Sequence, residues 1–93
     1  PPTYDEALFE ALRTWRAEVA RTLKVPAYVV FTDATLTALA EATPTDLRGV
    51  AAVPGVGTMK LDRYGAAVLE ILAGSDPLDV AEKTTAAMAS GSV

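Results

Sequence analysis

Residues 53–72 read VPGVGTMKLDRYGAAVLEIL, and their first five letters are the sharpest local feature of the chain. Pro54 fixes its own φ angle, while Gly55 and Gly57, on either side of Val56, permit backbone angles that other residues avoid. This sequence predicts a tight turn between two helices, similar to a helix-hairpin-helix. The turn therefore divides this part of the chain into a helix before it and a helix after it.

The remainder of this stretch predicts a long amphipathic helix. Its buried positions recur at intervals of three and four: Leu61, Tyr64, Gly65, Val68 and Leu72. We expect the helix to cover residues 58–73 and to end at Gly74. Gly65 lies on the buried face, where the lack of a side chain lets another helix approach closely.

A second amphipathic helix is predicted over residues 5–23, which contain no Pro or Gly. Its apolar stripe has helical spacing: Leu8, Leu12, Trp15, Val19 and Leu23. We expect Trp15 to be a packing residue. Thr3 and Glu6 match the Thr-x-x-Glu pattern of a capping box, so Thr3 is the expected cap. Pro26 ends the helix because the residue before a proline avoids the helical region.

The segment after Pro26 predicts short elements. Residues 27–31 are β-branched and aromatic, but no second strand is available to pair with them, so we expect a buried turn or a short helix. Thr32 or Asp33 is the expected cap of a helix over residues 34–42. Its inward-facing residues are predicted to be Leu36, Leu39 and Ala40.

A further short helix is expected before the glycine turn. Thr45 or Asp46 suits its N-cap, and it should extend to about Ala52. The predicted fold is therefore all-α, a compact bundle of about five helices with a helix-hairpin-helix-like GVG turn.

A chain of 93 residues, half of them apolar, is expected to form one domain around one core. We assign residues 4–73 to this domain and residues 1–3 to a linker. Residues 74–93 are rich in Ala, Ser, Thr and Gly, and we expect a flexible or weakly helical C-terminal tail. Asp76-Pro77 in that tail is able to start one more weak helix. The absence of an initiator Met indicates a piece of a longer protein.

The composition excludes most catalytic classes. The chain has no Cys and no His, so it lacks disulfides, a thiolate nucleophile, and the commonest metal ligand and general base. Its twelve acidic residues form no recognisable motif, and no GxxxxGK[ST] phosphate loop occurs. We therefore expect no catalytic residue, cofactor or metal in this chain. With no long apolar run and no signal peptide, the expected location is the cytoplasm, without membrane attachment.

The glycine turn is the first candidate binding site. The backbone amides around Gly55, Val56 and Gly57 precede a helix N-terminus, where exposed N–H groups and the helix dipole attract a phosphate without any basic side chain. The alternative is a compact helix connection that binds nothing, and the sequence leaves both open. The net charge of −4 argues against strong binding of nucleic acid.

Basic side chains supply the second candidate. Four fall within an arc of about 140° on the first helix: Arg13, Arg16, Arg21 and Lys24. They form either a positive strip or a solvated face paired with nearby glutamates, and we favour the second reading for Arg13 and Arg21.

Lys24 differs from these because Tyr28 follows one turn later, so that a charge and an exposed ring are available together for a nucleic-acid base. Lys60 and Arg63 lie just after the glycine turn and are placed to support a phosphate there. Their alternative role is simple solubility, with Asp62 and Glu70 nearby.

Three stretches in order carry a resemblance to a known family: YDEALFEALRTWRAEVA, VPAYVVFTDATLTALAEATP and VPGVGTMKLDRYGAAVLEIL. Over residues 4–73 the chain resembles the HRDC domain, the helicase and RNase D C-terminal module. The most specific segments are VPAYVVFTDATL and GVG-x-x-K-L-x-R-Y-G. The resemblance implies a bundle of about five helices that helps RecQ-family and UvrD-like helicases to engage DNA.

Within that resemblance, Tyr28 matches the aromatic that family members expose near a single-stranded DNA patch, and Lys60 and Arg63 match the K-L-x-R element. The implied function is weak, non-sequence-specific binding of single-stranded DNA within an ATP-dependent DNA helicase of repair or recombination. ATP and Mg²⁺ then belong to the parent protein, and the partners are DNA and the other helicase domains. The wording of the second stretch favours a UvrD-like bacterial parent, and we expect the isolated domain to be a monomer.

The acidic net charge keeps a second function open. The chain has Thr and Ala where basic residues would strengthen a DNA patch, which weakens the expected affinity. A protein-interaction or intramolecular docking module with little DNA binding is the alternative.

Overall fold

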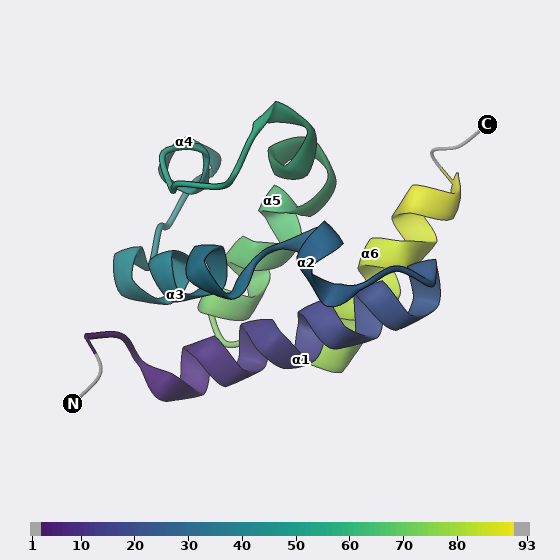
Figure 1. Ribbon diagram of the computed structural model, residues 1–93, viewed down its shortest axis with the longest axis horizontal. Coiled ribbons are helices and arrows are strands. Elements are labelled where there is room, and N and C mark those ends of the chain that lie inside the picture. Colours follow the sequence, from purple (N-terminus) through teal and green to yellow (C-terminus); the bar gives the residue numbers. More distant parts are fainter. Residues whose placement is uncertain (1–2, 91–93) are drawn as a thin grey trace.

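The computed structural model describes residues 3–90, which form six helices and no strand (Figure 1). In chain order the elements are α1 (Glu6–Leu23), α2 (Ala27–Val30), α3 (Asp33–Ala42), α4 (Leu47–Ala51), α5 (Thr58–Leu72) and α6 (Pro77–Ser90). The predicted all-α fold is confirmed, including a short helix in place of a strand after Pro26. None of these helices is long and apolar enough to cross a bilayer.

Short polar side chains mark the starts of four helices. The caps are Asp5 for α1, Thr32 for α3, Asp46 for α4 and Asp76 for α6. The predicted cap Thr3 is wrong, because the carboxylate of Asp5 accepts hydrogen bonds from the amides of Ala7 and Leu8 at 2.8 and 3.2 Å. Asp5 stands directly before the first helical residue, where a short side chain reaches those two amides.

Three aromatic rings join the helices at the centre of the core. Trp15 is fully buried, as predicted, and its ring centroid lies 6.1 Å from that of Phe31 and 5.5 Å from that of Tyr64. Phe31 and Tyr64 also meet edge to face at 5.6 Å. These rings belong to α1, to the junction between α2 and α3, and to α5, so one cluster fixes three parts of the chain.

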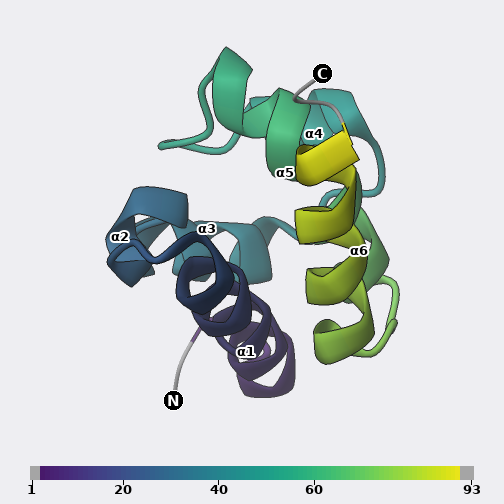
Figure 2. The same ribbon diagram turned by 90° about the vertical axis from the view of Figure 1, so that its right-hand side faces the viewer.

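Of the two states expected for the C-terminal tail, flexible or weakly helical, residues 77–90 adopt the helical one, as α6. This helix does not extend away as a tail but packs along α1 and α5 (Figures 1 and 2). Val80 and Ala81 are buried. The buried hydroxyl of Thr84 accepts a hydrogen bond from Trp15 Nε1 at 3.2 Å and donates one to the Val80 carbonyl at 2.7 Å.

The physical reason is that the central tryptophan needs both an apolar cover and an acceptor for its N–H, and α6 supplies them. The predicted helix start at Asp76-Pro77 is confirmed. Residues 1–2 of the expected linker and residues 91–93 lie outside the described part of the chain.

Helix α5 matches its prediction closely. A Cβ added at Gly65 would lie 2.8 Å from Leu47 Cδ2, which confirms that the missing side chain lets α4 approach α5. Gly74 has φ +106, in the left-handed region, and its N–H donates to the Ile71 carbonyl at 3.0 Å as the helix ends.

Candidate nucleic-acid interface

The glycine turn is seated against the start of α3. Thr35 Oγ1 donates a hydrogen bond to the Pro54 carbonyl at 3.2 Å. Gly55 has φ +93, and a Cβ added there would overlap Thr35 Oγ1. Pro54 and Gly55 are exposed on their outer side, but their conformation is set by this packing. The conformation of Pro54 and Gly55 is therefore explained by packing, as expected if the turn is a compact helix connection.

Val56 does not belong to a surface site. Its side chain is part of the core, and its N–H donates to the Val53 carbonyl at 3.1 Å. Neither group is available to a ligand, so the structure removes Val56 from the candidate residues. Val56 instead anchors the turn, because a buried side chain between two glycines fixes the direction in which α5 leaves.

The start of α5 has open amides. Gly57 is its N-cap and provides no side-chain hydrogen bond, unlike the capping residues of α1, α3, α4 and α6. Within residues 3–90, the N–H groups of Gly57, Thr58, Met59 and Lys60 have no hydrogen-bond partner. The positive end of a 15-residue helix is thus exposed, which is the arrangement that attracts anions.

The basic residues divide into paired and unpaired groups. Four of the eight Lys and Arg residues form ion pairs: Arg13 with Glu10, Arg16 with Asp33, Arg21 with Glu18 and Lys83 with Glu70. The other four make no ion pair within the described residues: Lys24, Arg48, Lys60 and Arg63. Three of these four are the basic side chains that the sequence predicts as site residues.

The positive strip considered for the first helix does not form, because Arg16 is buried. Its Nη1 donates to the Phe31 carbonyl at 3.0 Å and lies 2.7 Å from Asp33 Oδ1. Its side chain is only 8% exposed, and its two contacts join α1 to the junction of α2 and α3. A signal was present in the sequence: Arg16 follows the core residue Leu12 by four positions, which puts both on one side of the helix.

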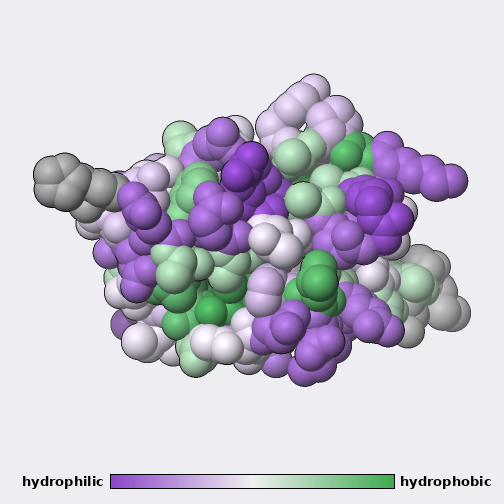
Figure 3. Space-filling model, turned by 90° about the horizontal axis from the view of Figure 1, so that it is seen from below, coloured by the Kyte–Doolittle hydropathy of each residue, from purple (hydrophilic) through white to green (hydrophobic). Residues whose placement is uncertain are grey.

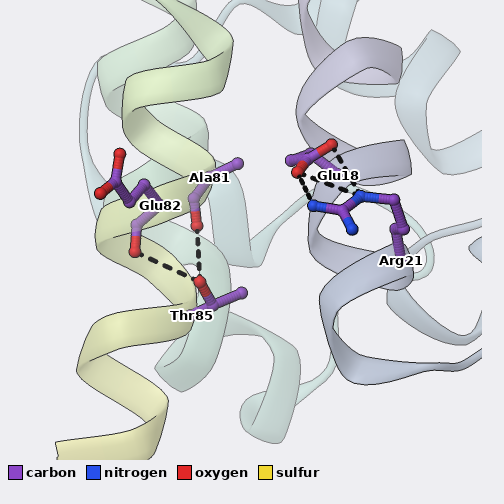
Figure 4. Close-up of polar contacts among 5 residues, drawn as sticks. All are labelled: Glu18, Arg21, Ala81, Glu82 and Thr85. Atoms are coloured by element: carbon purple, nitrogen blue, oxygen red, sulfur yellow. Dashed lines mark hydrogen bonds and ion pairs between the residues drawn. The ribbon is translucent and has the colours of Figure 1, made fainter.

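The remaining arginines of α1 pair locally, as predicted. Arg21 donates to the Glu18 carboxylate, and this hydrogen bond lowers the pKa of Glu18 and raises the pKa of Arg21 relative to their ordinary values. Figure 4 shows the pair on α1 facing α6, where Thr85 Oγ1 donates to the carbonyls of Ala81 and Glu82. Figure 3, which views the molecule from below α1, shows hydrophilic residues interleaved with small apolar patches. This face is solvated and paired, not a binding strip.

Tyr28 differs from the other aromatic residues. It is 66% exposed, whereas the remaining five rings each pack against another ring: Tyr4 with Phe9, and Trp15, Phe31 and Tyr64 together. The buried Val30 holds α2 against the core, so that Tyr28 projects from an anchored turn. An exposed ring on a fixed backbone is a suitable platform for stacking.

Lys24 precedes α2 and is exposed. It ends α1 with φ 60, and its N–H donates to the carbonyls of Ala20 and Arg21. This left-handed conformation is one that glycine adopts more readily than lysine. The charge of Lys24 therefore stands at a position where the fold alone would favour a residue without a side chain.

Lys60 links the start of α5 to the end of α2. Its Nζ lies 5.6 Å from the centroid of the Phe31 ring, and Phe31 directly follows α2. The contact is a cation–π interaction that leaves Lys60 without a carboxylate partner. Arg63, one turn later, is one of the residues that line a groove between α5 and α6. Met59, next to Lys60 in the chain, is 66% exposed, although no sequence pattern marked it as a surface residue.

Comparison with known proteins gives one family. Residues 5–72 match the family model described as the HRDC domain. The ATP-dependent DNA helicase UvrD2 of Mycobacterium tuberculosis is 50% identical over 70 residues, which cover 75% of this chain and 10% of the helicase. The ATP-dependent DNA helicase RecQ of Pasteurella multocida is 39% identical over 69 residues, or 74% of this chain and 11% of that protein.

A solved structure agrees with these sequences. The chain described as D. radiodurans RecQ HRDC domain 3 is 43% identical, with a TM-score of 0.67 over 70% of this chain and 86% of that one. The chain thus corresponds to a small part, about a tenth, of the curated helicases that it matches and to most of one isolated domain.

Proposed function

This chain belongs to the HRDC domain family, and from that premise we propose that it binds single-stranded DNA weakly, without sequence preference, as an accessory domain of an ATP-dependent DNA helicase. Identity is 50% to UvrD2 and 39% to the RecQ of Pasteurella multocida, which supports a UvrD-like parent. ATP hydrolysis, with its Mg²⁺, is assigned to the other nine-tenths of that parent. The proposed setting is DNA repair or recombination in the bacterial cytoplasm.

The distribution of unpaired cations is the observation that carries the proposal. In a chain of net charge −4, Lys24, Lys60 and Arg63 have no carboxylate partner among the described residues. Lys60 carries one of the open amides at the start of α5, and Arg63 follows it one turn later. Unpaired cations beside a helix N-terminus provide the local positive potential that a phosphate needs, even on an acidic protein.

The expected affinity follows from the number of contacts. Three phosphate contacts on a single strand give a slope of about −2 in log K against log salt. The dissociation constant then lies at the weak end of the non-specific range, roughly 10⁻⁴ M. A linker to the motor domains raises the effective concentration of DNA to about the millimolar range, so weak binding still affects how the helicase holds its substrate.

An NMR titration of the 93-residue chain with a short single-stranded oligonucleotide, at low and at moderate salt, tests the proposal. Chemical-shift changes should centre on Lys24, Tyr28 and residues 54–63, and they should weaken as salt rises. A spectrum that does not change at millimolar oligonucleotide would refute DNA binding.

Matched substitutions then locate the contacts. Tyr28→Ala should weaken binding by about 1–3 kcal/mol if a base stacks on the ring. Lys60→Gln should reduce the salt slope by about 0.7. Arg48→Gln is the comparison, because it removes a cation that also has no ion pair among the described residues but is not one of the predicted site residues. An unchanged affinity for Tyr28→Ala would remove the ring from the site.

The alternative, protein docking, is favoured by one region of α6. Three carboxylates line a surface groove of about 550 Å³ at its start: Asp76, Asp79 and Glu82. Leu78 in the same turn is 54% exposed. An acidic surface with an exposed leucine suits a basic protein partner better than DNA. Failure of the DNA titration, with binding of the purified motor domains to α6, would support this second function.

A further inference from the structure

A second groove continues from Arg63 along the contact between α5 and α6. It has a volume of about 210 Å³. Its lining consists of small and charged residues: Arg63, Ala66, Ala67, Glu70, Lys83, Thr84 and Ala87. The Thr84 hydroxyl is already bonded to Trp15 and to the Val80 carbonyl, so the chemistry of the groove lies in its three charged side chains.

The charge of this groove is opposite to that of its neighbours. Arg63 and Lys83 against Glu70 give the lining a net charge of +1. The groove between α1 and α6 contains Glu18, Arg21 and Glu82, for a net −1, and the groove at the start of α6 has a net −2 from three carboxylates and Lys83. On an acidic protein, an anionic strand is therefore directed to the contact between α5 and α6.

The groove is also continuous with the proposed DNA site. At about 100° per residue, Lys60, Arg63 and Glu70 fall within an arc of about 80° on α5. Glu70 lies about 10 Å further along the helix axis than Arg63, and it is there that Lys83 reaches across from α6. A line of cations thus runs from the open amides of α5 to the middle of α6.

We propose that the phosphate backbone of a bound single strand follows this line and that Lys83 exchanges its contact with Glu70 for a contact with a phosphate. This inference rests on the proposed function and extends its site by one residue. The Lys83–Glu70 pair is suited to such exchange, because Nζ and Oε1 are 3.6 Å apart and the two side chains are 69% and 45% exposed. An exposed ion pair of this kind is weak, so a phosphate competes with Glu70 for Lys83.

The sharpest test uses two isosteric substitutions with the same change in net charge. Glu70→Gln frees Lys83 beside the proposed path. Glu10→Gln frees Arg13 on α1, where the ion pair is of nearly equal length, 3.5 Å, and is also exposed. Both variants should fold, since neither glutamate side chain is buried. Thermal unfolding followed by circular dichroism checks this.

We expect Glu70→Gln to bind a short oligothymidylate about two- to fivefold more tightly than wild type at about 50 mM salt, because Lys83 no longer has to leave a carboxylate. The salt slope should stay nearly unchanged, because Lys83 contacts a phosphate in both proteins. Glu10→Gln should gain much less, and Lys83→Gln should lose about 0.7 of the slope. Equal gains for Glu70→Gln and Glu10→Gln, in a chain whose wild type binds, would overturn only the extended path. No binding by wild type or any variant would overturn the proposed function as well.

Discussion

Substituting the two glycines of the turn separates its structural role from its proposed binding role. Gly55→Ala places a methyl group in the left-handed region, at a cost of about 1–2 kcal/mol. The same methyl overlaps Thr35 Oγ1, whose hydrogen bond to the Pro54 carbonyl contributes about 1 kcal/mol. After an offset of about 0.4–1 kcal/mol for the stiffer unfolded chain, the net loss is about 2 kcal/mol.

Gly57→Ala is the matched control within the same turn. Gly57 has φ −86, an ordinary value, and a Cβ added there meets nothing within 4 Å. Its effect on the free energy of unfolding should stay within about 0.5 kcal/mol, since the poorer N-cap and the stiffer unfolded chain nearly cancel. The added methyl does, however, stand beside the open amides of α5, so it should weaken DNA binding.

The assay is urea and thermal unfolding of both variants, followed by the oligonucleotide titration. For a domain of this size, a loss of 2 kcal/mol lowers Tm by about 8–16 °C. Equal destabilisation by the two substitutions would refute the packing account of Gly55. A stable Gly57→Ala variant with wild-type affinity would show that no phosphate is bound at the start of α5.

Three further predictions concern single side chains. Lys24→Gly should raise the free energy of unfolding by about 0.5–1 kcal/mol, because it relieves the left-handed backbone at φ 60. The same change should weaken DNA binding, because it removes a cation. Urea unfolding should therefore show higher stability while the oligonucleotide titration shows lower affinity. Thr84→Val should cost about 1–3 kcal/mol by leaving the buried Trp15 N–H without an acceptor, whereas Thr84→Ser should be much milder, and tryptophan fluorescence follows the unfolding. The pKa of Glu18, measured by NMR, should lie below the ordinary value for glutamate and return to it in Arg21→Gln. Since the folded-state pKa is the lower one, the contribution of this pair to stability is present above the unfolded pKa and is lost as pH falls through the folded pKa.

The candidate site was only partly predictable. The residue types at Lys24, Tyr28, Lys60 and Arg63 follow from the sequence, and the structure leaves these side chains exposed or unpaired. Whether a basic side chain forms an ion pair with another helix was not predictable, because this depends on which carboxylates the fold brings close to it. Arg16 and Lys83 illustrate this: one is buried against the end of α2, and the other is held by a glutamate of α5.

Elements whose cause is local could be predicted from the order of the residues alone. α1 ends shortly before Pro26, α5 ends shortly before Gly74, and the two glycines of the turn separate α4 from α5, because backbone angles and missing side chains act within a few residues. The spacing of apolar residues likewise determined which faces of α1 and α5 are buried.

The position of the C-terminal segment depends instead on long-range packing. Its run of small residues has a weak apolar stripe, so nothing local marked it as part of the core. It became α6 because Trp15, far away in the sequence, needs an apolar cover and an acceptor for its N–H, and Thr84 provides that acceptor. Contacts between residues distant in sequence depend on the packing of the whole chain, and for that reason the groove between α5 and α6 became visible only in the folded molecule.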